Sequence, residues 1–157
     1  MLLEEQVGEA LQSRGLTVAT AESCTGGLIA SRLTDISGSS AYLLGGVVAY
    51  SNAIKMKLLN VAEKTLIDHG AVSEPTARQM AIGARTLIGT DYALSVTGIA
   101  GPGGGTAEKP VGLTYIGLAG PDGIVIVERR VWPHDRLGNK QASADAALEL
   151  LLRQFDG

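Results

Sequence analysis

The sequence predicts a single α/β domain over residues 1–157, built around a mixed β-sheet. Short apolar runs alternate with segments of helical periodicity, which is the pattern of strands joined by helices. Near the carboxyl end, two apolar runs instead flank a four-residue turn, which indicates an antiparallel hairpin. With 157 residues, 45% of them apolar and 18% charged, the chain can bury a core made mainly of Val, Ile, Leu and Ala.

The first third of the chain predicts a helix, a βα unit and a second strand. Leu3, Val7 and Leu11 recur every four residues among acidic side chains, which is typical of an amphipathic helix, and Gly15 is placed to end it. Gly45 and Gly46 interrupt the second strand and indicate close approach of a ligand or of another element. The further expected elements are a strand at 16–21, a helix at 28–33, a turn at 37–40, a strand at 43–50, and a short helix that Asn52 caps and that contains Lys55.

The rest of the chain predicts two long helices, one more strand and the hairpin. Ser73, followed by Glu74 and Pro75, is a typical helix N-cap. The apolar side chains after Ser73 and those near the end of the chain recur at helical spacing. The apolar faces comprise Ala77, Met80, Ala81, Ala84, Leu87 and Ile88 in one helix and Ala144, Ala147, Leu148, Leu151, Leu152 and Phe155 in the other. The strands are expected at 92–96, 111–119 and 124–131.

Charge and cysteine content exclude several classes of function. Thirteen basic and sixteen acidic residues give a net charge of −3 without a basic cluster, so the charge pattern does not support binding to nucleic acid or to a membrane surface. No apolar stretch reaches the roughly 18 residues of a membrane span, and the start of the chain is acidic. Cys24 is the only cysteine, so no intramolecular disulfide can form, and we expect a cytoplasmic protein.

Ser23 lies where a predicted strand passes into a predicted helix, a place at which α/β proteins display nucleophiles. Helix N-terminal N–H groups there can stabilise an oxyanion. Two other interpretations remain open: Ser23 and Thr25 can simply cap the helix, and Cys24 can be an activated thiol, although a lone cysteine is more often a small core residue.

A nucleophilic serine needs a base, and lysine is the better candidate. The chain has only His69 and His134, and His69 lies in an Asp-His-Gly turn, so a serine–histidine–acid triad has few members. Lys55 follows Tyr50 across a strand–helix junction, which allows both to face one cleft, and burial lets lysine act as a base. A solvated Lys55 is the plain alternative. Ser51, four residues before Lys55, is a rival nucleophile.

A glycine-rich loop, residues 98–105, follows the strand that ends near Val96. It matches neither a Walker loop nor the GxGxxG pattern, but its backbone N–H groups can approach an anionic ligand closely. No cluster of His, Cys, Asp and Glu has the spacing of a metal site, so we expect no metal and no cofactor.

Five ordered motifs resemble the C-terminal domain of the CinA family, in the stand-alone form that deamidates nicotinamide mononucleotide. The motifs are ATAESCTGG, GSS, GGVVAYSNAIK, HGAVSEPTARQMAIGAR and VTGIAGPGGGTAEKPVG, and the resemblance runs from about Thr17 to Leu152. It implies a three-layer α/β/α fold and hydrolysis of the nicotinamide amide to the acid and ammonia. It also implies that Ser23 attacks the carboxamide and that Tyr50 and Lys55 assist proton transfer.

The resemblance further implies a set of substrate-binding residues. Backbone N–H groups near Cys24 and Thr25 are expected to stabilise the oxyanion, and the glycine-rich loop and Arg136 to hold ribose and phosphate. Lys140 stands where the family usually has a second arginine, which keeps the charge but loses bidentate geometry, and Asn139 replaces a usual apolar residue. The full expected set is Cys24, Thr25, Gly26, Gly46, Thr97, Gly98, Gly101, Gly103, Gly104, Arg136 and Lys140.

Two rival functions remain open from the sequence. One is a non-catalytic module that binds a nucleotide or a protein and is linked to competence or DNA damage. The other is an amidase or esterase that acts on a different phosphorylated amide. We also expect a homo-oligomer, with the hairpin over residues 111–131 as one edge that can pair between subunits.

Overall fold

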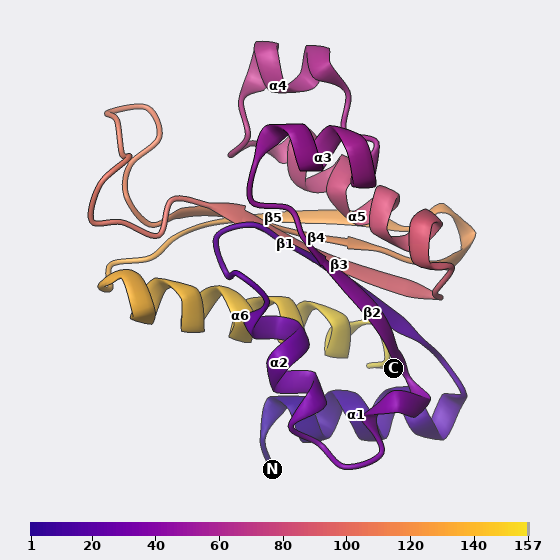
Figure 1. Cartoon of the computed structure of the whole chain (residues 1–157). Helices are drawn as coiled ribbons and strands as arrows, with labels where there is room; N and C mark the ends of the chain where they lie inside the picture. Colours follow the sequence, from indigo (N-terminus) through magenta and orange to yellow (C-terminus); the bar gives the residue numbers. More distant parts are fainter. Residues whose placement is uncertain (157) are drawn as a thin grey trace.

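The computed structural model describes residues 1–156 and has three layers, with a β-sheet between two layers of helices (Figure 1). The sheet has five strands in the order β2-β1-β3-β4-β5. β1 pairs in parallel with β2 and β3, whereas β3, β4 and β5 pair antiparallel, so the expected mixed sheet and α/β/α fold are confirmed. The strands are β1 (Val18–Glu22), β2 (Leu43–Val48), β3 (Tyr92–Gly98), β4 (Leu113–Ala119) and β5 (Val125–Val131).

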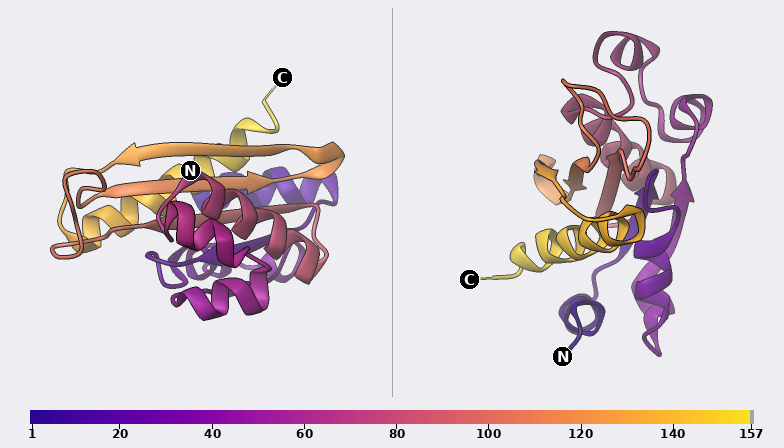
Figure 2. Two further views of the ribbon diagram at one scale, coloured as in Figure 1. Left: turned by 90° about the horizontal axis from the view of Figure 1, so that it is seen from above. Right: turned by 90° about the vertical axis from the view of Figure 1, so that its left-hand side faces the viewer.

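Helices cover both faces of the sheet. One face carries α1, α2 and α6, and the other carries α3, α4 and α5 (Figures 1 and 2). Within residues 1–156, none of these helices combines the length and apolar character needed to cross a membrane. The helices are α1 (Leu3–Arg14), α2 (Leu28–Thr34), α3 (Asn52–Leu59), α4 (Glu63–His69), α5 (Glu74–Ile88) and α6 (Arg136–Arg153), with 3₁₀ turns η1 (Ser39–Ala41) and η2 (Pro121–Gly123).

Most of the expected elements are confirmed, with three corrections. Helix α4 was not predicted, because it has no side-chain cap and no fully buried residue, and only Leu66 of its apolar side chains packs against the core. The cap of α3 is Ser51 rather than Asn52, since the Ser51 side chain accepts the N–H of Ile54. Strand β2 ends at Val48, two residues earlier than expected, so Tyr50 lies in the segment that leads into α3.

Each face of the sheet has its own aliphatic core, as the composition predicts. The core under α1, α2 and α6 is the larger and contains long side chains, whereas the core under α3 and α5 relies on alanine. Members of the first core include Val7, Leu11, Ile29, Leu94, Ile116 and Leu148, and members of the second include Ala19, Ala21, Leu59, Met80, Ala84 and Ala93.

The topology brings four chain segments to one edge of the sheet. β1, β2 and β3 are parallel, and two antiparallel steps make β5 run in the same direction as β3. The segments that follow these four strands therefore meet, and such carboxyl ends are where open α/β sheets bind ligands. They carry Ser23, Tyr50, the long loop after Gly98, and the start of α6 at Arg136.

Candidate active site

Ser23 sits in a tight turn directly after β1. Its backbone N–H donates to the carbonyl oxygen of Val96 at 2.9 Å, and its own carbonyl oxygen accepts the N–H of Gly26 at 3.1 Å. Gly26 and Gly27 have φ values of 63° and 104°, a conformation that glycine adopts without steric cost. This turn leads the chain from β1 into α2 and leaves the Ser23 side chain facing the carboxyl edge of the sheet.

Lys55 is the side chain that meets Ser23. Its Nζ donates to Ser23 Oγ at 3.2 Å and to the carbonyl oxygen of Tyr50 at 3.2 Å. Only 1% of Lys55 and 8% of Ser23 is exposed, so the solvated alternative for Lys55 is wrong. Burial lowers the pKa of Lys55, and among residues 1–156 no carboxylate lies within ion-pairing distance of it. A buried lysine in this state can accept a proton from a serine hydroxyl.

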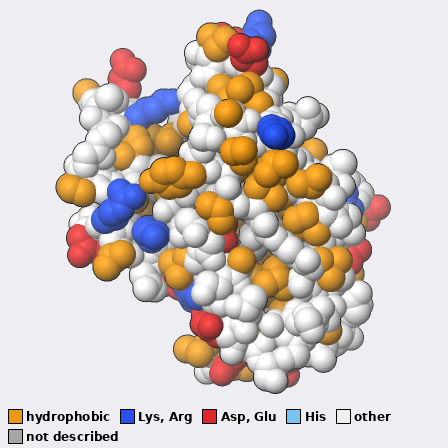
Figure 3. Space-filling model, in the orientation of Figure 1, with side chains coloured by type: hydrophobic (Ala, Val, Ile, Leu, Met, Phe, Trp, Pro, Cys, Tyr) orange, Lys and Arg blue, Asp and Glu red, His pale blue; other side chains and the backbone are white. Residues whose placement is uncertain are grey.

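The pair lies in a small polar cavity of about 220 Å³. Its lining comes from the four segments at the carboxyl edge together with α3 and the loop before α5. The lining residues are Ser23, Cys24, Tyr50, Asn52, Lys55, Ala71, Val72, Thr97, Gly98, Ala100 and Arg136. Figure 3 shows basic side chains gathered on the same side of the molecule as the long loop and the start of α6.

Tyr50 lines the same cavity as Lys55, as expected, but its hydroxyl group bonds a different residue. Its carbonyl oxygen, not its hydroxyl, bonds Lys55, and its hydroxyl instead accepts from Arg136 Nη2 at 3.3 Å. Arg136 Nη1 donates to the carbonyl oxygen of Gly101 at 2.7 Å, and the Tyr50 side chain is 64% exposed. The phenol therefore belongs to a rim formed with Arg136 and the glycine-rich loop, above the buried pair of Ser23 and Lys55.

The expected binding residues fall into three groups. Cys24, Thr97, Gly98 and Arg136 line the cavity. A second group lies beside it: Lys140 Nζ is 3.9 Å from where a side-chain carbon on Gly26 would stand, Thr25 is buried next to Cys24, and Gly101 bonds Arg136. The third group is outside the lining and consists of Gly46, Gly103 and Gly104.

Gly46 lies in β2 opposite Thr20 of β1. A side-chain carbon on Gly46 would stand 2.3 Å from Thr20 Oγ1, so this glycine allows two strands to approach each other rather than a ligand to approach the backbone. Thr97 is also used internally, because its hydroxyl donates to the carbonyl oxygen of Ala71 at 2.7 Å. It thereby holds the loop that forms one wall of the cavity.

The rival reactive groups do not have suitable surroundings. The pKa of the Cys24 thiol is raised to about 12, chiefly by burial, so the thiol stays protonated near neutral pH. Ser51 Oγ accepts the N–H of Ile54 as a helix cap, while Lys55 turns to Ser23. His69 is the last, exposed residue of α4. Among the described residues there is no group of three side chains able to hold a metal ion.

Several residues of the site were not singled out from the sequence. Asn52, Ala71, Val72 and Ala100 line the cavity, and Asn52 and the Ala71–Val72 pair lie inside two of the family-like motifs. Asn139, noted from the sequence only as a departure from the family, is 1% exposed, and its side chain makes two hydrogen bonds: its NH₂ group donates to the carbonyl oxygen of Ala100 and its oxygen accepts the N–H of His134. Its polarity thus has a structural use beside the site.

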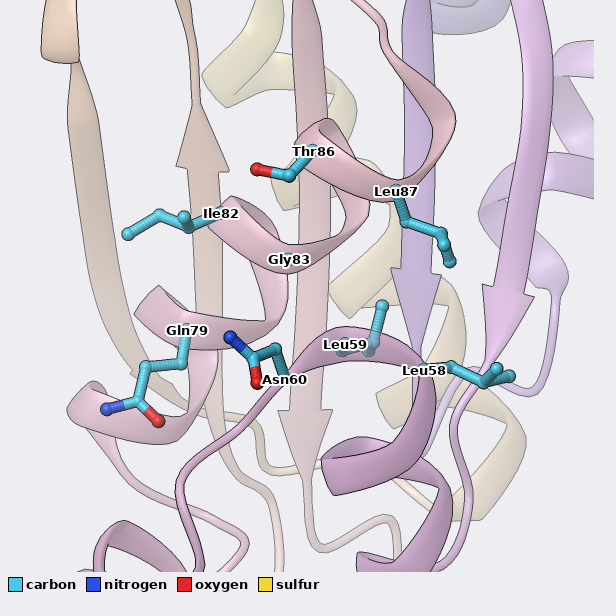
Figure 4. A pocket seen from close by; sticks show the side chains of 8 residues that line it. All are labelled: Leu58, Leu59, Asn60, Gln79, Ile82, Gly83, Thr86 and Leu87. Atoms are coloured by element: carbon cyan, nitrogen blue, oxygen red, sulfur yellow. The ribbon is translucent and has the colours of Figure 1, made fainter.

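A larger hollow of about 400 Å³ lies elsewhere, between α3 and α5. Figure 4 shows its side chains, which are mostly aliphatic and include no acid or base. They are Leu58, Leu59, Asn60, Gln79, Ile82, Gly83, Thr86 and Leu87. The groove therefore lacks the serine–lysine pair that the smaller cavity holds.

Comparisons with known proteins show which family the chain belongs to. A family model, the CinA C-terminal domain, matches residues 2–155. A "CinA-like protein" of Chloroherpeton thalassium is 55% identical over 96% of this chain but 37% of its own length, so the chain spans little more than a third of that relative. The "Nicotinamide-nucleotide amidohydrolase PncC" of Escherichia coli is 50% identical over 99% of this chain and 94% of its own length.

A solved structure supports the same relationship. The crystal structure of the competence/damage inducible protein CihA from Agrobacterium tumefaciens superposes with a TM-score of 0.92, at 45% identity, over 96% of this chain and 94% of that one. Family model, full-length relatives and solved fold thus all agree, and the chain belongs to the CinA family, whose C-terminal domain it represents.

Proposed function

We propose that this chain is an amidohydrolase that converts nicotinamide mononucleotide to nicotinate mononucleotide and ammonia through an acyl-enzyme at Ser23. The observation that carries the proposal is the contact at 3.2 Å between Ser23 Oγ and the buried Nζ of Lys55. The printed name of the Escherichia coli relative, a nicotinamide-nucleotide amidohydrolase of nearly equal length, supports the choice of substrate.

In the first half-reaction, neutral Lys55 takes the proton of Ser23 Oγ as that oxygen attacks the carboxamide carbon. The tetrahedral intermediate collapses when its C–N bond breaks, and the protonated Lys55 gives the proton to the departing nitrogen, which leaves as ammonia. In the second half, Lys55 takes a proton from water, the resulting hydroxide attacks the ester, and the proton returns to Ser23 Oγ. The lowered pKa of Lys55 supports both transfers.

The oxyanion of each intermediate would be held by the backbone N–H groups of Cys24 and Thr25. Neither group donates to a protein acceptor among residues 1–156, whereas the neighbouring N–H groups of Ser23 and Gly26 both do. Two free amides beside the nucleophile form the arrangement that stabilises a developing negative charge in acyl transfer. The chemistry then needs no metal or cofactor.

Substrate would be held across the rim of the cavity. A cavity of about 220 Å³ suits the pyridine ring and its carboxamide, while the ribose phosphate extends toward the outside. Arg136 and Lys140 lie one turn apart on α6, and their positive charges would pair with the phosphate. Tyr50 and the loop carrying Gly98, Gly101, Gly103 and Gly104 would close over the ribose.

The biological setting of this proposal is pyridine nucleotide salvage in the cytoplasm by a homo-oligomer. For self-association, β2 is a better edge than the hairpin expected from the sequence. β2 is uncharged and exposes Leu44 and Val48, whereas the opposite edge strand, β5, carries Glu128, Arg129 and Arg130. Charged residues on an edge strand disfavour pairing with another chain.

Ammonia release from nicotinamide mononucleotide tests the proposed function, with free nicotinamide as a second substrate. We expect Ser23→Ala to lower the rate by about 10⁴-fold or more without unfolding the protein. Ser95→Ala is the matched control, because Ser95 is also buried but lies in the middle of β3, where its hydroxyl bonds the carbonyl oxygen of Ala77. An active Ser23→Ala variant would contradict the mechanism, and an inactive wild type would favour a binding module or another phosphorylated amide.

A further inference from the structure

Glu22, the last residue of β1, is a buried carboxylate next to the nucleophile. It is 1% exposed, and both of its oxygens are engaged: Oε1 accepts the N–H of Ile29 at 2.8 Å and Oε2 accepts the N–H of Ala30 at 3.0 Å. These N–H groups belong to the first turn of α2. One side chain therefore links the end of the strand to the start of the helix, and the turn with Ser23 lies between.

Helix α2 depends on this link because it lacks a cap of its own. Its N-cap residue is Gly27, which is in a left-handed conformation and has no side chain to accept a hydrogen bond. The first N–H groups of a helix need an acceptor, and a carboxylate at that end also interacts favourably with the helix dipole. Glu22, five residues before the N-cap, supplies both the hydrogen-bond acceptors and the negative charge.

The link also determines which N–H groups remain available to a substrate. The N–H groups of Ile29 and Ala30 are committed to Glu22, so α2 cannot offer them to an oxyanion. The N–H groups of Cys24 and Thr25, in the turn itself, remain unpaired among the described residues. Their direction depends on how the turn is held at its two ends, by the Ser23–Val96 backbone bond and by Glu22.

We propose that Glu22 is a positioning residue that holds the turn so that Ser23 Oγ and the Cys24 and Thr25 amides point at the same reacting carbon. This inference rests on the proposed function for the identity of the substrate. The geometry of Glu22 and the turn is independent of that function. In Glu22→Gln, one oxygen becomes an NH₂ group, which cannot accept from a backbone N–H. One end of the turn is then released while the side-chain volume is preserved.

A matched control exists at the opposite end of the same strand. Asp91 Oδ2 accepts the N–H of Thr17 at 2.9 Å and its hydroxyl at 3.0 Å, just before β1 begins. Asp91→Asn therefore also removes a carboxylate that anchors β1, but far along the strand from Ser23. The two variants separate a general loss of stability from a loss of positioning.

The first readout is steady-state ammonia release from nicotinamide mononucleotide. We expect Glu22→Gln to lower kcat by about 10²-fold with KM changed less than about 3-fold, since a displaced oxyanion donor costs transition-state binding rather than substrate binding. The pH at which kcat rises should stay that of the wild type, because Lys55 is untouched. Asp91→Asn should keep the wild-type kcat, even if its melting temperature falls by as much as that of Glu22→Gln.

The second readout does not depend on the substrate. An alkyl fluorophosphonate phosphonylates an activated serine: Ser23 Oγ bonds phosphorus, the P–F bond breaks, and fluoride leaves with the serine proton. Intact mass reports the rate. Slower labelling of Glu22→Gln than of Asp91→Asn supports the proposal even if wild type releases no ammonia, in which case only the substrate assignment fails. Equal labelling rates, or a wild type that is not labelled, would overturn it.

Discussion

Two hollows of this molecule, the groove between α3 and α5 and the cavity at Ser23, differ in size and in content, and the smaller of the two is the candidate active site. The groove between α3 and α5 has about 400 Å³ and a mostly aliphatic lining, whereas the cavity at Ser23 has about 220 Å³ and a serine, a buried lysine and an arginine. Volume alone would favour the groove over the cavity. What distinguishes a site is that reactive groups from several elements converge on one point.

The two hollows also arise in different ways. The groove lies along a close contact of two helices: a side-chain carbon on Gly83 of α5 would stand 1.9 Å from the carbonyl oxygen of Leu59 in α3. The cavity lies beyond the ends of parallel strands, where the chain leaves the sheet and its backbone groups are not all paired. Substitutions in the groove should therefore change stability, and substitutions in the cavity should change rate or affinity.

The largest expected effect in the cavity, after removal of Ser23, is that of Lys55→Arg. Guanidinium stays protonated and cannot serve as a base, so kcat should fall by about 10³-fold. In the proposed mechanism the neutral form of Lys55 is the active one, and burial lowers the pKa of Lys55, so kcat should rise with pH through that pKa and then level off. Measured kcat against pH checks both points.

The exposed Lys57, two residues later on α3, provides the matched control. Lys57→Arg should retain the rate and the pH profile of the wild type. A Lys55→Arg variant that keeps the rising limb would show that another group takes the serine proton.

The largest expected effect in the groove is that of Gly83→Ala. The added methyl group overlaps the Leu59 carbonyl, so α3 and α5 must separate, and we expect the free energy of unfolding to fall by about 3 kcal/mol. Urea denaturation measures this change, and kcat per folded molecule should stay close to that of the wild type. Leu87→Ala, at an exposed position of the same groove, should cost less than about 0.5 kcal/mol.

A large loss of kcat in folded Gly83→Ala would contradict the separation of groove and cavity. Such a loss could arise because α3, which lines the groove, also carries Lys55. The helix would then transmit strain from the groove to the cavity, and the two hollows could not be treated as independent.

The smallest expected effect is a gain in substrate affinity from a substitution at the rim of the cavity. Lys140→Arg restores a planar, bidentate partner for phosphate, so KM for nicotinamide mononucleotide should fall by about 3-fold to 10-fold with kcat unchanged. Initial rates over a range of substrate concentrations separate the two constants, and Lys57→Arg again controls for the added guanidinium. A change in kcat instead would place Lys140 nearer to the acyl chemistry, beside Cys24, whose pKa it affects.

Local patterns were sufficient to predict most elements and to select the residues that meet at the centre of the candidate site. Apolar periodicity predicted α1, α5 and α6, and strand–helix junctions directed attention to Ser23, Lys55 and Tyr50. Periodicity failed for α4, because none of its seven residues is fully buried and only Leu66 of its apolar side chains packs against the core. A pattern of burial can reveal only those helices that have a buried face.

Which atoms meet was decided by the tertiary structure. Ser23 and Lys55 are 32 residues apart, and only the parallel pairing of β1 with β2 brings the start of α3 to the turn after β1. The same arrangement buries Lys55 and brings the Tyr50 hydroxyl within hydrogen-bonding distance of Arg136. It also packs Gly46 against Thr20, so that this glycine contacts a neighbouring strand rather than a ligand. The residue types and their local conformations follow from short-range preferences, but pKa, hydrogen-bond partner and exposure depend on what the fold packs against each side chain.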